Sequence, residues 1–308
     1  MSEPTTHQSP GARAWRRFRA NRAAYLSLWV LLLLVGGILL LPLFSSQSPT
    51  HLSDALSQGP THTHWFGTDT LGRDLFSRVV HGSRISLLVG LVGAAVSLVI
   101  GVLWGATAGY LGGRWDNLMM RVVDILYSLP SIVFVIVLIT TLEGLAKDFL
   151  TKTISPDAAG LVRMLFLFVG LGAVSWLTMA RIVRGEVLAL RSRSFVEASR
   201  LLGAGHVRIL FHHILPNIAG VVVIYLMLTI PAVILYESFL SYLGLGIQPP
   251  QASLGSLIAE GAAQINPIRI YWWMVVFPAS LLVVLLLALN FLGDGLRDAL
   301  DPRGSREG

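Results

Sequence analysis

The stretch ISLLVGLVGAAVSLVIGVLWGATAGY, residues 85–110, decides the class of fold, because it contains no Lys, Arg, Asp or Glu. An α-helix rises about 1.5 Å per residue, so about 20 apolar residues cross the roughly 30 Å hydrocarbon core of a bilayer. The stretch is longer than this minimum. It therefore predicts a helix that spans a membrane.

The rest of the chain repeats this pattern. Hydrophobic residues make up 54% and charged residues 13% of the sequence, whereas soluble proteins have about 25% charged residues. Pro130, Pro231 and Pro278 interrupt three apolar blocks, and such prolines are tolerated where neighbouring helices satisfy the freed backbone groups. We therefore predict an all-α integral membrane protein with six transmembrane helices. The five further uncharged blocks are residues 24–44, 125–142, 164–180, 218–236 and 271–292.

Basic residues predict the orientation of these helices. With the N-terminus in the cytoplasm, sixteen of the 23 Lys and Arg residues fall on the cytoplasmic side. Cytoplasmic loops carry an excess of Lys and Arg, so the distribution predicts an N-in, C-in topology with residues 143–163 outside. The predicted segments are a basic cytoplasmic tail 1–23, a first transmembrane helix 24–44, an outer loop 45–84, a membrane core 85–292 and a cytoplasmic tail 293–308.

The cytoplasmic loop 193–216 has small and apolar residues at helical spacing on both sides of two glycines. This pattern predicts two short amphipathic helices joined by a glycine turn, in which Gly203 needs either a positive φ or a close backbone approach. Such helices either rest on lipid headgroups or fit a groove in a partner protein. The spaced positions are Phe195, Ala198, Ser199 and Leu202 before the turn, and Val207, Leu210, Phe211 and Ile214 after it.

The same loop resembles the EAA loop of bacterial ABC importer permeases, whose pattern is EAA-x3-G-x9-I-x-LP. Ser199 stands at the second Ala and His213 at the Ile, with Ile214 beside it. Both departures are similar to variants in the peptide-permease branch. The resemblance implies that the ATPase-coupling residues are Glu197, Ala198, Ser199, Gly203, Leu215 and Pro216.

Four more segments resemble the C-type permease subunit of dipeptide and oligopeptide importers, and look closest to the oligopeptide branch. They include GTDTLGRD at 67–74, in the predicted periplasmic loop. Segment 143–163, between the predicted third and fourth spans, is longer than the corresponding segment usually is in that subunit. The matching segments are FGTDTLGRD at 66–74, VSWLTMARIVRG at 174–185, ESFLSYLGLG at 237–246 and GDGLRDALDP at 293–302.

The resemblance implies a type I ABC importer fold in the bacterial inner membrane. It implies a heterodimer with a homologous B-type permease subunit, two ABC ATPase subunits on the coupling loops, and an extracytoplasmic peptide-binding protein that delivers peptide. ATP and Mg would be bound by the ATPases and no cofactor by this chain. Related C subunits import nickel, haem or antimicrobial peptides, so the cargo stays open at this point.

A ladder of glycines in the second block, Gly101, Gly105 and Gly109, predicts close helix packing. The partner helix belongs either to this chain or to a second membrane subunit. Glu237 lies near the outer end of the fifth block and is either a pathway or gate residue or a carboxylate paired within the subunit. Asp124 is expected to cap the third helix or to pair with Arg121.

Several other functions lack their residues. No Gly-x4-Gly-Lys-Ser/Thr motif occurs, so the chain is not expected to hydrolyse ATP or to be an enzyme. The pairs His62/His64 and His212/His213 have no third ligand at suitable spacing, so no metal site is predicted. The net charge of +6 is not arranged as a nucleic-acid-binding stripe. An ion-coupled secondary transporter would need acids at mid-membrane, whereas these acids lie near helix ends.

Overall fold

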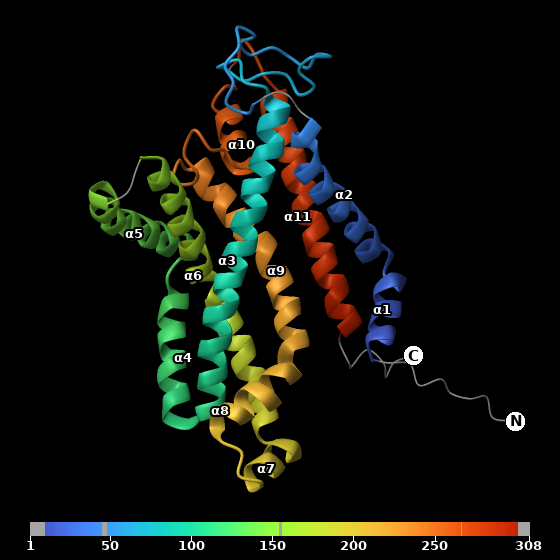
Figure 1. The fold of residues 1–308 in the computed structure, drawn as a ribbon, viewed down its shortest axis with the longest axis vertical. Helices are drawn as coiled ribbons and strands as arrows, with labels where there is room; N and C mark the ends of the chain where they lie inside the picture. The colour runs from blue at the N-terminus through green and yellow to red at the C-terminus, as the bar shows by residue number, and fades with distance from the viewer. Residues whose placement is uncertain (1–9, 45–47, 154–155, 266, 301–308) are drawn as a thin grey trace, which may run out of the picture.

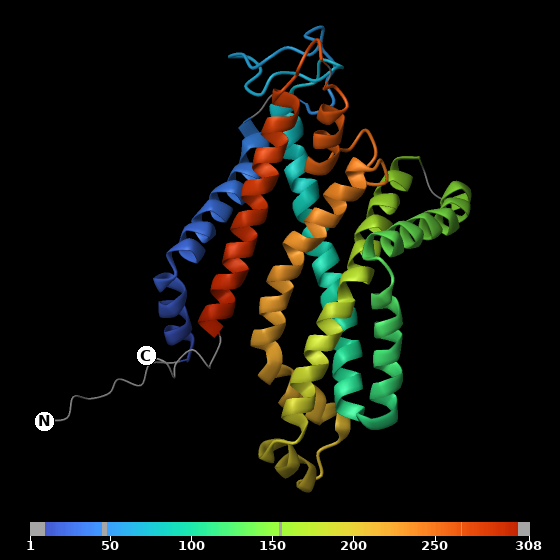
Figure 2. The ribbon, with the colours of Figure 1, turned by 180° about the vertical axis from the view of Figure 1, so that it is seen from behind.

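The computed structural model describes residues 10–44, 48–153, 156–265 and 267–300, and these residues form a bundle of long helices (Figures 1 and 2). No strand occurs in these ranges; the one isolated β-bridge joins Thr68 to Asp74. The helices are α1 (Pro10–Ala20), α2 (Arg22–Phe44), α3 (Leu75–Leu111), α4 (Gly113–Ser128), α5 (Ser131–Thr153), α6 (Pro156–Arg191), α7 (Ser194–Leu201), α8 (His206–Arg208), the π-helix η1 (Ile209–Ile214), α9 (Leu215–Tyr242), α10 (Leu254–Ala262) and α11 (Trp273–Leu300).

Among the described residues, five helices are long and apolar enough to cross a membrane. Helices α4 and α5, which meet at a bend of 97°, are long and apolar enough only as a pair, and they add a sixth span when the pair is counted as one. The prediction of an all-α membrane protein is therefore confirmed, and its number of six spans is reached when α4 and α5 count as one broken span. The five continuous spans are Arg22–Leu41, Leu75–Leu111, Met164–Arg191, His206–Tyr242 and Trp273–Leu300.

The predicted third helix, 125–142, is wrong as a single element. The chain leaves the helix at Leu129, whose φ of −77° and ψ of 139° are extended. Pro130 explains the break, because a proline disfavours helical backbone in the residue before it. Pro231 and Pro278, by contrast, lie inside the continuous helices α9 and α11.

Several helices continue beyond the uncharged blocks. Arg78 and Arg84, predicted in the outer loop, lie on α3, and most of the predicted loop 143–163 belongs to α5 and α6. The predicted C-terminal tail is helical as far as Leu300, and residues 301–308 lie outside the described residues. The boundaries differ because charged residues mark where apolar sequence ends, while backbone hydrogen bonding can continue into water.

Helix α3 runs through the centre of the bundle and packs against α6 and α9. A Cβ added to Gly101 would lie 2.6 Å from Cβ of Met179, and one added to Gly105 would collide with the carbonyl oxygen of Ala180. At Gly109 the nearest atom is the carbonyl oxygen of Arg184, at 2.8 Å. The ladder therefore packs α3 against α6 within this chain, the first of its two predicted partners.

The two ends of the bundle differ. Residues 48–74 and the short helix α10, which the sequence did not predict, lie at one end, and α7 lies at the other (Figure 1). The N-terminal basic segment is helical in α1 and packs on the end of α11, where Phe18 is buried beside Ala299. The N-terminal helix and the end of α11 thus lie toward the α7 end, as the N-in, C-in topology requires.

Candidate functional site

Helix α7 carries the first half of the loop motif and is held to the bundle by one buried side chain. Val196 is fully buried, and it packs in a cluster with Val183 and Val187 of α6 and with Ile209 and Ile214 of η1. The small and apolar face that the sequence predicts points away from the bundle. On this face Phe195 is 39% and Leu202 is 88% exposed, and Ala198 is exposed as well. A small and apolar helix face is thus available on the cytoplasmic end of the chain.

Gly203 ends this helix in a left-handed conformation, with φ of +82°. The N–H of Gly203 donates to the carbonyl of Arg200 at 2.9 Å, and the N–H of Ala204 donates to that of Ser199 at 3.0 Å. These two bonds form a Schellman cap, which requires a residue that tolerates positive φ. No atom lies within 4 Å of a Cβ placed on Gly203, so the required feature is the positive φ and not a close approach.

The second predicted short helix is wrong as a separate element. Residues His206–Arg208 and the π-helix η1 continue directly into α9, so they form the cytoplasmic end of the fifth span. Leu215 and Pro216 stand in the first turn of α9. The predicted apolar face is divided, since Ile214 is buried while Val207 is 72% exposed. A displacement of the loop would therefore be transmitted along one helix into the membrane.

Tyr110, at the end of α3, joins both halves of the loop. Its hydroxyl lies 2.9 Å from Nδ1 of His206, and the guanidinium carbon of Arg200 lies 5.9 Å from the centre of its ring. Sequence reasoning missed this residue, because a tyrosine at the edge of an apolar block is also typical of membrane interfaces.

Two ion pairs join α4 to α6 in the half of the bundle that carries α7. Asp124 pairs with Arg181 at 2.7 Å, so neither the predicted cap nor the predicted pair with Arg121 is observed. Asp116 accepts two hydrogen bonds from Arg184, at 2.5 and 2.7 Å. Helix α6 runs parallel to α3 and antiparallel to α4. This arrangement brings the paired residues together although they are 57 and 68 positions apart.

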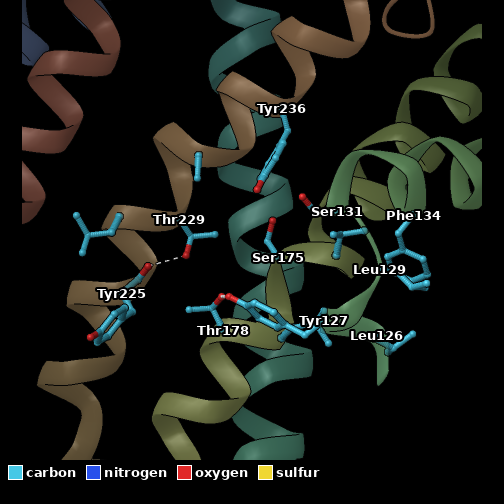
Figure 3. Close-up of a pocket in the computed structure, with 14 residues that line it drawn as sticks. Leu126, Tyr127, Leu129, Ser131, Phe134, Ser175, Thr178, Tyr225, Thr229 and Tyr236 are labelled. Atoms are coloured by element: carbon cyan, nitrogen blue, oxygen red, sulfur yellow. Dashed lines mark hydrogen bonds between the residues drawn. The ribbon is translucent and has the colours of Figure 1, made fainter. Parts of the chain in front are cut away.

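A cavity of about 490 Å³ lies where the α4–α5 break faces α6 and α9 (Figure 3). None of its lining residues is charged, and hydroxyl-bearing side chains alternate with apolar ones. No pattern in the sequence predicts this cavity, because the cavity depends on the bend at Leu129 and Pro130. The lining residues are Leu126, Tyr127, Leu129, Ser131, Phe134, Val174, Ser175, Leu177, Thr178, Tyr225, Leu228, Thr229, Ala232 and Tyr236.

Glu237 does not line this cavity, although Tyr236 beside it does. Its side chain is fully buried, and its Oε1 accepts a hydrogen bond from Ser241 at 2.6 Å. Within the described part of the chain, Oε2 has no hydrogen-bond partner. The observed contact is with its own subunit, and a gate role for Glu237 stays a prediction.

At the opposite end, residues 48–74 and α10 form what we call the outer cap. Arg78 of α3 donates to Asp69 and to Glu260 of α10, both at 2.7 Å, and Arg73 donates to Asp69 at 2.6 Å. Asp74 caps α3 by accepting from the N–H of Ser77. The GTDTLGRD segment therefore supplies the carboxylates that fasten the outer cap to α3.

Comparison with known proteins shows which family the chain resembles. The family described as "Binding-protein-dependent transport system inner membrane component" matches residues 101–306. The chain belongs to this family. A second family, the "N-terminal TM domain of oligopeptide transport permease C", matches residues 9–60. The predicted permease family and the multi-pass location in the inner membrane are thereby confirmed.

Curated relatives of this permease agree over nearly the full length. OppC of Escherichia coli strain K12, an oligopeptide transport system permease protein, is 47% identical over 94% of this chain and 90% of that protein. OppC of Haemophilus influenzae is 42% identical over 96% and 91% of the two chains. DppC of Bacillus subtilis, a dipeptide transport system permease protein, is 41% identical over 94% and 85%.

A solved structure supports the fold. The MetNI methionine ABC transporter in an inward-facing conformation contains a chain that covers 73% of this permease and 97% of its own length, with a TM-score of 0.54 and 22% identity. The ABC importer permease fold is therefore shown. The relatives are transport permeases, which makes this chain a non-enzymatic membrane subunit.

Proposed function

We propose that this permease is the C-type subunit of an ABC importer that moves oligopeptides or dipeptides across the inner membrane. Oligopeptide and dipeptide permeases of similar length and 41–47% identity support this cargo. The observation that carries the proposal is the outward-facing side of α7, which is anchored by Val196 and oriented by the Gly203 cap.

The coupling mechanism follows from how the loop is attached. An ATPase that moves when it binds and hydrolyses ATP can displace the bundle only through a rigid contact. Helix α7 offers Phe195, Ala198 and Leu202 to a groove in that ATPase. Because η1 runs without interruption into α9, movement of the loop would tilt the span that lines the cavity. ATP and Mg are bound by the ATPases in this mechanism.

The partners follow from the same proposal. A homologous B-type permease would form the other half of the channel, two ABC ATPases would bind the paired coupling loops, and an extracytoplasmic binding protein would deliver peptide. The glycine ladder no longer supports the second permease, because it packs against α6. The family description supports the binding protein. The second permease rests on the resemblance of loop 193–216 to the EAA loop of importer permeases.

Reconstitution in lipid vesicles tests the proposal. The chain is combined with its homologous permease, both ATPases and the binding protein, and uptake of a labelled peptide is measured. We expect uptake that requires ATP and is lost when the second permease is omitted. Uptake driven by an ion gradient without ATP, as in a secondary transporter, would contradict the proposal. So would uptake by this chain with the ATPases alone.

A further inference from the structure

The cavity between α4, α5, α6 and α9 has an unusual chemical lining for a space at membrane depth. Half of the fourteen residues that surround it carry a hydroxyl group, and none carries a charge. The hydroxyl groups come from all four helices, and apolar side chains such as Leu126, Phe134 and Leu228 complete the lining. The hydroxyl-bearing residues are Tyr127, Ser131, Ser175, Thr178, Tyr225, Thr229 and Tyr236.

These hydroxyl groups are only partly used within the chain. Tyr127 bonds to Thr178 at 3.2 Å, while Ser175 and Thr229 each donate to the carbonyl one turn earlier in their own helix. Among the described residues, the hydroxyl of Tyr236 has no hydrogen-bond partner, and Figure 3 shows it turned toward Ser175 and Ser131. A hydroxyl oxygen that donates once still accepts through its lone pairs.

The backbone at the cavity points to a ligand independently. The α4–α5 break places the non-helical residue Leu129 and residues Ser131 and Phe134 from the start of α5 at the cavity wall. The first N–H groups of a helix have no partner within that helix. At membrane depth, such irregular backbone is tolerated where it is covered by protein or lines a polar cavity, and broken helices mark binding sites in other transporters.

This chemistry selects one class of ligand. A charged group buried here would lack a counter-charge, and a metal ion would lack carboxylate or imidazole ligands. An acyl chain would offer no hydrogen-bond partner to the hydroxyl groups that line the cavity. An extended peptide main chain, however, presents alternating N–H and C=O groups, and hydroxyl groups can pair with both. The volume lies in the range of small-molecule sites, about 300–1,000 Å³, so it fits part of an oligopeptide.

We propose that this cavity binds the main chain of the peptide in transit, so that the permease accepts peptides without regard to side-chain charge. The inference rests on the proposed peptide function and adds the binding surface to it. Its consequence is specific: a single charge placed in the cavity creates a charge preference that the wild-type wall does not impose.

Charge insertion at Thr229 tests this consequence. Among the described residues, the one side-chain hydrogen bond of Thr229 is to its own helix. Thr229→Lys, Thr229→Glu and the uncharged Thr229→Gln therefore alter the cavity wall without breaking a hydrogen bond between helices. Uptake of Ala-Lys-Ala is divided by uptake of Ala-Glu-Ala in the complete complex, and each ratio is divided by that of the wild type. This double ratio cancels the preference of the binding protein and differences in assembly.

We expect the double ratio to fall about tenfold for Thr229→Lys, to rise by a similar factor for Thr229→Glu and to stay near one for Thr229→Gln, because like charges at contact repel strongly. Ratios near one for all three variants would overturn the inference. If wild-type uptake still required ATP in that case, the proposed function would stand and only this binding surface would be rejected.

Photocrosslinking supplies a test that does not depend on inserted charge. A photoreactive phenylalanine analogue replaces Tyr236 in the cavity or, as a control, Tyr242 on the same helix, which is 58% exposed and does not line the cavity. We expect an adduct with a transported peptide at position 236, in the presence of ATP and the binding protein, and none at 242. Phospholipid adducts without peptide adducts at 236 would show a lipid site and overturn the inference.

Discussion

The outer cap and the coupling loop lie at opposite ends of the same helices and are built in opposite ways. In the outer cap, Arg78 and Asp69 are 4% and 1% exposed and pair with each other. On α7 of the coupling loop only Val196 is buried, and Leu202 is 88% exposed. The outer cap pairs buried charges within the chain, whereas α7 leaves most of its apolar side chains exposed. The exposed face of α7 is the surface to which the proposed ATPase would bind.

This contrast also separates two uses of glycine. Gly105 in the bundle is required by a neighbouring backbone, and Gly203 in the loop is required by its own φ. Substitution at the first position should damage the fold, while substitution at the second should damage docking. The predictions below test that division, beginning with the largest expected effect.

Gly105→Leu should be the most destabilising single change. Its Cβ would collide with the backbone of Ala180, so α3 would have to move away from α6, at a cost of about 3 kcal/mol or more. The control is Gly185→Leu on α6, where no atom lies within 4 Å of the added Cβ. Thermal unfolding of the purified chain in detergent measures both. Equal losses of stability would show that the ladder is not a packing contact.

Arg78→Met should destabilise the outer cap less strongly. Asp69 would keep Arg73 but lose one charged partner while remaining buried, which costs about 2–3 kcal/mol. The matched control is Arg181→Met, which breaks the exposed pair with Asp124 and should cost less than about 1 kcal/mol. Both are measured by the same unfolding assay. A cost for Arg181→Met as large as that for Arg78→Met would contradict the contrast in burial.

Tyr110→Phe should have the smallest effect on stability. It removes one exposed hydrogen bond to His206 and keeps the ring beside Arg200, so about 0.5 kcal/mol is expected. Tyr110→Ala also removes the ring and should release more of the loop, detectable as faster proteolysis between residues 200 and 206. Equal proteolysis of the wild type and Tyr110→Ala would show that Tyr110 does not hold the coupling loop.

The sequence predicts the spans well because burying a charge in lipid is costly, so the segments that cross the membrane contain few charged residues. Residues 85–110 are recognisable for this reason, and the loop motif at 197–216 is recognisable from its spacing. The break at Pro130 is not, since Pro231 and Pro278 in similar blocks leave their helices continuous. The packing around α4 and α5 decides that Pro130 breaks its helix, whereas Pro231 and Pro278 do not break theirs.

The site is less predictable than the fold, because its contacts join distant positions. Arg78 and Glu260 are 182 residues apart, and Tyr110 and His206 are 96 apart. The cavity draws residues from four helices and exists only because one of the spans bends. The positive φ of Gly203 is one of the two alternatives that the sequence predicts for this position, because a glycine between two amphipathic segments is typical of a helix cap.

The central claim is that the coupling loop transmits ATPase movement through the orientation of α7, and Gly203→Val tests it most directly. Valine at φ of +82° is strained by about 1–2 kcal/mol, enough to shift docking about tenfold. Gly205→Val is the matched control, because Gly205 has φ of −67° and open space around it.

ATPase co-purification and substrate-stimulated ATP hydrolysis are measured in the reconstituted complex. We predict that both fall about tenfold for Gly203→Val, with normal assembly of the two permeases, and stay near wild type for Gly205→Val. Unchanged values for Gly203→Val in both assays would contradict the claim and favour a loop that rests on lipid headgroups.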